Sequence, residues 1–280
     1  MAANVGNENE KRSKQPLLAV RELTLHYKQR RAFGAEKTAA KAFQNISLDL
    51  HRGKTLALVG ASGSGKSSLA RSLVLLEKPN SGQILFEGRD LLAATPQELK
   101  KARREIQLIF QDSASALNPN LTVEKSLAEP LVIHEPRSPR AEIQKRICQV
   151  MEQVQLPTKW LTKKPLELSG GQRQRAAIAR SLALKPKILL LDEALSALDL
   201  STQGQIANLL LDLQTQHTLT YLFITHDLSL AGALAHEAAI MQAGHIIQRG
   251  SPAILFTANL QSTSGLLLPD SSSRETIRAT

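Results

Sequence analysis

The sequence is poor in several features that would each point to a class of protein. Its 280 residues include a single cysteine, Cys148, which excludes an intramolecular disulfide and a cysteine-ligated cluster and suits a reducing compartment. No apolar run approaches the roughly 18 residues needed to span a bilayer, and residues 1–16 lack the apolar core of a secretory signal. We therefore expect a soluble protein on the cytoplasmic side, with a disordered tail at 1–16.

Acidic residues are also in short supply, with 25 Asp and Glu against 35 Lys and Arg, for a formal charge of +10. A basic surface can bind nucleic acid or an anionic membrane, and it can also serve solubility alone. Aromatic residues are only 3% of the chain, too few for a platform that stacks bases. We therefore expect no nucleic-acid partner. Binding to an anionic membrane and solubility alone both remain as explanations of the positive charge.

One glycine-rich stretch follows an apolar strand pattern at 55–59 and precedes a helical pattern. It matches G-x-x-x-x-G-K-[ST], the pattern of a phosphate-binding loop. Its glycines let successive backbone N–H groups converge on phosphates at the positive end of a helix. Its lysine would reach the β- and γ-phosphates, and the next serine would ligate Mg²⁺. The predicted nucleotide-binding residues are Gly60, Ala61, Ser62, Gly63, Ser64, Gly65, Lys66, Ser67 and Ser68.

A second apolar strand pattern, at 188–191, ends on the two acids Asp192 and Glu193. The carboxyl ends of parallel strands meet at one edge of a sheet, so these carboxylates are predicted to lie beside the phosphate loop. There Asp192 would hold Mg²⁺, and Glu193 would polarise an attacking water. The two patterns together predict nucleotide hydrolysis.

Strand and helix patterns alternate along most of the chain, which is typical of an α/β fold. The alternation is interrupted between about 112 and 167, where helical patterns at about 122–133 and 140–155 predict an inserted helical subdomain. The strand patterns lie at 17–27, 42–50, 55–59, 83–87, 106–110, 187–191, 220–225, 238–242 and 246–249; the other helical patterns lie at 96–104, 170–184, 201–216 and 228–235.

The residues Leu-Ser-Gly-Gly-Gln at 168–172 resemble the signature sequence of the ATP-binding-cassette (ABC) ATPases, and they stand shortly upstream of the acid-ended strand, as in that family. The resemblance spans about 17–255. It implies a P-loop NTPase core with a mostly parallel central sheet, an N-terminal antiparallel β portion and the inserted helical subdomain. We accordingly expect one ABC ATPase domain at 17–260, with a flexible tail at 261–280.

The resemblance also implies roles for residues outside the two patterns. It makes Tyr27 the aromatic that stacks on adenine and Gln111 the residue that senses the γ-phosphate and Mg²⁺. It makes His226 a contact to the γ-phosphate and 196–199 the loop that crosses to a partner subunit. With Glu193, Gln111 and His226 are the catalytic residues expected here.

The signature itself has a physical reading beside the resemblance. Its serine can cap the helix that follows and leave backbone N–H groups for an anion. Because Lys66 already serves the phosphates within one chain, this second anion site makes sense if it meets the nucleotide of another chain. The residues expected to bind that nucleotide are Ser169, Gly170, Gly171 and Gln172.

A narrower resemblance lies in residues 110–119, Phe-Gln-Asp-Ser-Ala-Ser-Ala-Leu-Asn-Pro, which are similar to the peptide and nickel importer subfamily. Ser113 stands where proline is common, Ala194 follows the acids where proline is usual, and the tail lacks a His-Pro-Tyr-Thr segment. These departures are similar to the nickel-importer ATPase and to relatives that import metal-metallophore complexes.

The resemblance therefore implies an ATPase subunit of a multi-subunit importer, with ATP and Mg²⁺ as cofactors and nickel, metal complexes or peptides as cargo. It implies a second ABC ATPase subunit, a paralogue, as partner, together with two integral-membrane permeases and an extracytoplasmic solute-binding protein. The expected location is the cytoplasmic face of the inner membrane, as a peripheral subunit.

Two other functions stay open on this sequence. One is a soluble ABC ATPase acting on nucleic acid or ribosomes, although such proteins usually carry longer insertions or two cassettes. The other is a regulatory subunit that binds ATP without hydrolysing it, against which the intact Lys66, Asp192, Glu193 and His226 argue. GTPases are disfavoured because no Asn-Lys-x-Asp motif is present.

Overall fold

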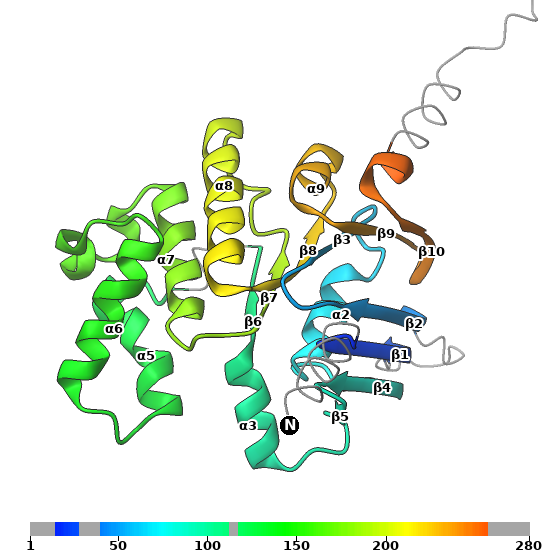
Figure 1. Ribbon diagram of the computed structural model, residues 1–280, viewed down its shortest axis with the longest axis horizontal. Helices are drawn as coiled ribbons and strands as arrows, with labels where there is room; N and C mark the ends of the chain where they lie inside the picture. Colours follow the sequence, from blue (N-terminus) through cyan, green and yellow to red (C-terminus); the bar gives the residue numbers. More distant parts are fainter. Residues whose placement is uncertain (1–14, 28–39, 112–116, 257–280) are drawn as a thin grey trace, which may run out of the picture.

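The structure is a computed structural model that describes residues 15–27, 40–111 and 117–256. The predicted tail at 261–280, most of the tail at 1–16, and Ser113 lie outside the described residues. Figure 1 shows two sheets that lie one above the other at one side of the molecule, with a group of helices at the other side.

The smaller sheet is antiparallel and comes mainly from the N-terminal part of the chain. Its strands are, in spatial order, β2 (Ala40–Leu50), β1 (Leu18–Tyr27), β4 (Ser81–Phe86) and β5 (Arg89–Asp90). This sheet is the predicted antiparallel portion.

The larger sheet is mostly parallel, with one antiparallel pair at its edge, between β10 and β9. Its strands are, in spatial order, β10 (His245–Gly250), β9 (Glu237–Gln242), β3 (Thr55–Val59), β8 (Thr220–Thr225), β7 (Ile188–Asp192) and β6 (Ile106–Ile109). The three central strands β3, β8 and β7 are buried along their whole length, as expected of parallel strands covered on both faces.

Successive residues of an inner strand serve two separate cores. In β7, Leu189 and Leu191 pack with α8 (Leu200–His217), whereas Ile188 and Leu190 pack with α2 (Lys66–Leu73) and the antiparallel sheet. This alternation follows from the two-residue period of a strand. The central sheet is thereby sandwiched between α8 and α9 (Leu228–Leu234) on one face and α2 with the antiparallel sheet on the other (Figure 1).

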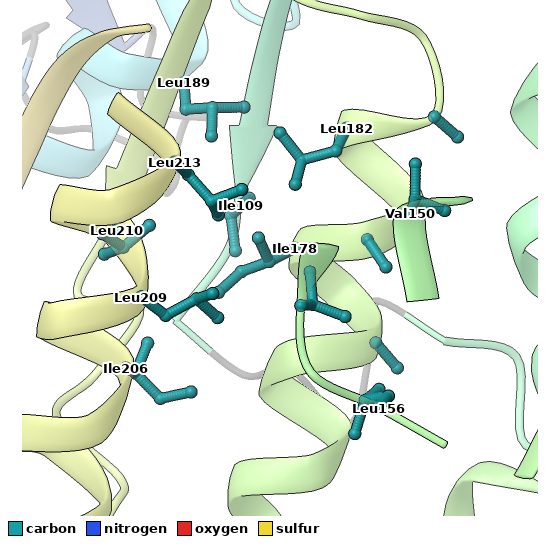
Figure 2. Packing of buried hydrophobic residues seen from close by; sticks show 14 of the residues in the cluster. Ile109, Val150, Leu156, Ile178, Leu182, Leu189, Ile206, Leu209, Leu210 and Leu213 are labelled. Atoms are coloured by element: carbon teal, nitrogen blue, oxygen red, sulfur yellow. The ribbon is translucent and has the colours of Figure 1, made fainter. Parts of the chain in front are cut away.

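The helical region contains α5 (Val123–His134), α6 (Arg140–Gln153), α7 (Gly170–Leu182) and two short 3₁₀ helices, η1 (Thr158–Thr162) and η2 (Pro165–Glu167). Figure 2 shows how α7 joins this region to the core: Ile178 and Leu182 of α7 lie opposite Leu209 and Leu213 of α8, beside Ile109 of β6. One continuous apolar cluster therefore supports both the helical region and the central sheet.

The predicted fold class is confirmed, and each predicted strand and helix within the described residues is present, with ends that shift by a residue or two. Thr95 forms a capping box with Glu98 at the start of α3 (Pro96–Glu105). The two-residue strand β5 and the 3₁₀ helices were missed because such short elements carry no periodicity. The division of the chain into a cassette and two tails stays a prediction.

Candidate nucleotide-binding site

The glycine-rich stretch forms the turn between β3 and α2, and two of its glycines have no room for a side chain. A Cβ on Gly65 would stand 2.2 Å from the carbonyl oxygen of Ala42, and one on Gly60 would stand 2.1 Å from that of Met241. Gly65 is also left-handed, with φ 103°, which L-residues adopt at a cost. The loop is therefore pressed against the neighbouring backbone and can take only glycine at these positions.

The helix that follows the loop starts without a side-chain cap and without an acidic residue in its first turn. The amides of a first helical turn have no intrahelical partner, and here no side chain competes for them. Together with the positive end of the helix dipole, they suit an anion such as phosphate.

Lys66 is 3% exposed and curls back over the loop. Its ammonium donates hydrogen bonds to the carbonyl oxygens of Gly60, at 2.8 Å, and Ala61, at 2.9 Å. Burial lowers the pKa of Lys66, while the carboxylates of Glu193 and Asp192 act in the opposite direction. The positive charge of Lys66 therefore lies inside the loop, where it could interact with the oxygens of a bound phosphate.

The Ser67 hydroxyl donates a 2.8 Å hydrogen bond to Oδ1 of Asp192, which is 3% exposed at the end of β7. Burial raises the pKa of Asp192, and the hydrogen bond from Ser67 opposes that shift. A hydroxyl and a carboxylate are the oxygen ligands that Mg²⁺ takes beside nucleotide phosphates, so this pair fits that ion. No group of three or more His, Cys, Asp and Glu side chains suited to a metal ion occurs in the described part of the chain.

Glu193 is the point at which the predicted catalytic side chains meet. Its Oε2 accepts a 3.0 Å hydrogen bond from Nε2 of Gln111 and lies 3.7 Å from Nδ1 of His226, and its Oε1 lies 4.0 Å from Nζ of Lys66. The backbone of Glu193 is left-handed, with φ 48°, which is unusual for a residue with a long side chain. This turn follows immediately after β7 and directs the carboxylate toward the phosphate loop.

Tyr27, at the end of β1, also lies beside the loop helix. Its hydroxyl is 2.9 Å from Oγ of Ser68, in the first turn of α2, and it donates to the carboxylate of Glu77. The residue is 41% exposed. The sequence reasoning missed Glu77, because a glutamate in the polar turn after a helix has no pattern to distinguish it.

The signature residues lie elsewhere. Ser169 and Gln172 form a reciprocal capping box at the start of α7, with bonds of 2.9 and 3.3 Å, as predicted for the serine. A Cβ on Gly171 would stand 2.5 Å from Cγ2 of Thr202, so this helix start packs closely against α8. In Figure 1, α7 and α2 stand on opposite sides of β6 and β7. Within one chain the structure does not bring the signature to the phosphate loop.

Comparisons with known proteins agree with this geometry. Residues 43–196 match the family described as "ABC transporter". The chain is 41% identical over 242 residues to the dipeptide transport ATP-binding protein DppF of Escherichia coli strain K12, covering 86% of this chain and 72% of that protein. It is 43% identical over 243 residues to the glutathione import ATP-binding protein GsiA of Salmonella paratyphi A, covering 86% of this chain but only 39% of that longer protein.

A solved structure shares the fold. The ATP-binding cassette MJ0796, determined as a dimer in a post-hydrolysis state bound to ADP and phosphate, superimposes with a TM-score of 0.74 at 29% identity, covering 84% of this chain and 98% of that one. The family match, the identity to DppF and this likeness coincide with the phosphate loop, the acid-ended strand and the signature helix. The chain therefore belongs to the ABC transporter family, and it is an ATP-binding cassette ATPase.

Proposed function

We propose that this chain hydrolyses ATP as a subunit of a multi-subunit importer for small peptides. The observation that carries the proposal of hydrolysis is the convergence of Gln111, His226 and Lys66 on Glu193, beside the Ser67 and Asp192 pair. What supports import is the similarity to DppF and GsiA, which are named for dipeptide transport and glutathione import.

In this proposal the phosphate loop and Lys66 bind the β- and γ-phosphates of ATP, and Tyr27 stacks on adenine. Ser67, Asp192 and Gln111 would hold Mg²⁺, which would supply positive charge to the phosphate oxygens. Glu193 orients the attacking water and accepts a proton from it. The Glu193 side chain can do so because it lies beside the phosphate loop and is 14% exposed. His226 donates from Nδ1 or Nε2 to the γ-phosphate oxygens as negative charge spreads over them.

The second half of the site is proposed to come from another chain. The first amides of α7 follow Ser169, and α7 and the loop helix α2 stand on opposite sides of β6 and β7 (Figure 1), so Ser169, Gly170, Gly171 and Gln172 are proposed to bind the γ-phosphate held by a partner cassette. The dimeric state of the related MJ0796 cassette supports this arrangement. The subfamily resemblance favours a paralogue as the partner.

The choice of a peptide as cargo follows from the named relatives. DppF and GsiA are both named for small peptides, which favours a peptide cargo. A second candidate is nickel or a metal complex. Ser113 and Ala194 favour it, since they replace the prolines usual in the peptide importers.

The proposed partners are two permeases that span the membrane and an extracytoplasmic solute-binding protein, with this chain peripheral at the cytoplasmic face. In the described residues, no helix is both long and apolar enough to cross a bilayer. Closure and opening of the two cassettes would move the helical region and, through it, the permeases.

Co-purification tests this proposal. The chain is tagged, expressed at native level and recovered from detergent-solubilised membranes, and the proteins that accompany it are identified by mass spectrometry. The proposal predicts two permeases and a second cassette ATPase, and the accompanying binding protein would then distinguish peptide from metal cargo. Ribosomal proteins or DNA without a permease would reject import and leave only the ATPase.

A further inference from the structure

The hydroxyl of Tyr27 joins two parts of the fold that are distant in sequence. A carboxylate can only accept, so the hydroxyl donates its single proton to Glu77 and accepts from Oγ of Ser68. Tyr27 lies at the end of β1, Ser68 in the first turn of the loop helix α2, and Glu77 in the turn that follows this helix. The hydroxyl thus uses both of its hydrogen-bonding capacities on the helix α2 and the turn that follows it.

Glu77 is itself held in place by the end of that helix. Leu75 takes a left-handed conformation with φ 54° and ends α2, and the backbone N–H of Glu77 points at the carbonyl oxygen of Arg71, at 3.4 Å. The Arg71 guanidinium also lies 3.4 Å from Oε1 of Glu77. The Glu77 side chain is 22% exposed, so its carboxylate has little freedom and presents one oxygen to Tyr27.

Tyr27 is 41% exposed, so packing alone restrains the orientation of its ring only weakly. The two hydrogen bonds of its hydroxyl supply that restraint, because they connect the far end of the ring to the helix that carries Lys66 and Ser67 and to the turn that follows it. The ring is then fixed relative to the phosphate loop before any nucleotide arrives, which lowers the entropy cost of stacking.

We propose that Glu77 is a positioning residue for nucleotide binding: held by Arg71, its carboxylate fixes the ring of Tyr27 at the spacing from the phosphate loop that an adenine nucleotide needs. This inference rests on the proposed role of Tyr27 in stacking on adenine. Glu77 touches neither base nor phosphate in this scheme, and it acts through Tyr27 alone.

The competing explanation is structural: the Glu77 and Arg71 pair closes the end of α2 and holds the whole loop. The two explanations differ in which half of the nucleotide is affected. A positioning role concerns only the base, whereas damage to α2 weakens the binding of phosphates as well. Inorganic tripolyphosphate, which carries the phosphates without a base, separates them.

The experiment measures dissociation constants for Mg²⁺-ATP and for Mg²⁺-tripolyphosphate by titration calorimetry, on the purified full chain. The variants are Glu77→Ala, Tyr27→Phe, Tyr27→Ala and the double variant Tyr27→Phe with Glu77→Ala, with the exposed Glu152→Ala on α6 as matched control. Glu77→Ala should weaken ATP binding about three- to tenfold, the loss expected for one ordinary intramolecular hydrogen bond, and leave tripolyphosphate binding within about twofold. In the Tyr27→Phe background, Glu77→Ala should add less than about twofold, because the hydroxyl on which it acts is gone.

Equal losses for ATP and tripolyphosphate would overturn the inference in favour of the structural role, and so would an unchanged affinity for ATP. Tyr27→Ala tests the underlying proposal separately: if it leaves ATP binding unchanged, Tyr27 does not stack on adenine and both ideas fall together. If Tyr27→Ala weakens ATP while Glu77→Ala does not, only the positioning role is rejected. Should Glu77→Ala not fold, Glu77→Gln keeps the side-chain volume and one acceptor, and a smaller loss confined to ATP is then expected.

Discussion

Nε2 of Gln111 donates a 3.0 Å hydrogen bond to Oε2 of Glu193, a residue 82 positions later in the chain. The pairing of β6 with β7 explains the contact. In that parallel pair Ile109 lies opposite Leu191, so the residues two positions beyond each also arrive side by side, at the edge of the sheet where the phosphate loop begins. The register of four residue pairs between β6 and β7 thus places Gln111, which is expected to sense the nucleotide, in contact with Glu193, the proposed catalytic base.

This contact predicts that removing the Gln111 amide impairs hydrolysis more than binding. We expect Gln111→Ala to lower ATP turnover of the assembled transporter about tenfold or more, since the Glu193 carboxylate loses the group that orients it. The dissociation constant for ATP should change less than about threefold. Steady-state turnover and equilibrium binding on the same preparation check this, and an equal loss in both would show that Gln111 serves mainly to bind the nucleotide.

Glu193→Gln should abolish turnover without loss of ATP binding. An amide cannot accept the proton of the attacking water, and general-base catalysis is worth about 10² to 10⁴ in rate, yet Gln preserves the shape of the side chain and an oxygen that can accept from Gln111. A closed, ATP-bound dimer should accumulate and be visible by size-exclusion chromatography. If the purified complex keeps turning over ATP, Glu193 is not the base; Glu152→Gln serves as the surface control.

The glycines of the phosphate loop are predicted to differ in their tolerance of alanine. Gly65→Ala places a Cβ 2.2 Å from the carbonyl oxygen of Ala42, so the loop must move and ATP binding should be lost. Gly63→Ala has the same left-handed strain but no atom within 4 Å of the new Cβ, and it should cost about 1–2 kcal/mol of unfolding free energy with binding retained. Chemical denaturation and ATP titration of both variants check this prediction. If the left-handed backbone is the only reason for glycine at both positions, the two variants will lose ATP binding equally.

The helical region is tied to α3 through Glu135, and this link should be sensitive to acid. Oε1 and Oε2 of Glu135 each accept a 2.9 Å hydrogen bond from Arg146, and Arg104 of α3 also pairs with Oε1. Burial raises the pKa of Glu135, but the hydrogen bond from Arg146 and the charge of Arg104 outweigh it and leave the pKa below its ordinary value of 4.5.

A carboxyl whose pKa is lower in the folded state than in the unfolded chain stabilises the fold above about pH 4.5, and that stabilisation is lost as the pH falls through the folded pKa. We expect Glu135→Gln to lower the unfolding free energy at pH 7 by about 1–3 kcal/mol and to flatten its decline below pH 4.5. Denaturant unfolding at several pH values checks this. Glu142→Gln removes the charge of the more exposed partner of Arg146 and should change the unfolding free energy little. An effect equal to that of Glu135→Gln would show that the link depends on Arg146 and not on Glu135.

Local patterns were enough to predict most of the elements and the loop that binds phosphate. A phosphate loop is specified by its own residues, because glycines, lysine and serine at fixed spacing act over one turn and the start of α2. The cap of Ser169 on α7 was predictable for the same reason, since both partners of the capping box lie three positions apart. Such interactions depend on chain geometry over a few residues.

The arrangement around these elements depended on contacts between distant residues. The left-handed turn at Glu193, the hydrogen bond from Gln111 and the link from Tyr27 to Glu77 across 50 positions follow from sheet register and from the packing of α2 under the central sheet. By itself the sequence determined the strands, the helices, the phosphate loop and the chemical groups available for hydrolysis, because propensity, capping and loop motifs are local. Only the tertiary structure decided which of these groups meet and that the signature stands apart from the loop in one chain, because those distances depend on strand order and on the shared apolar core.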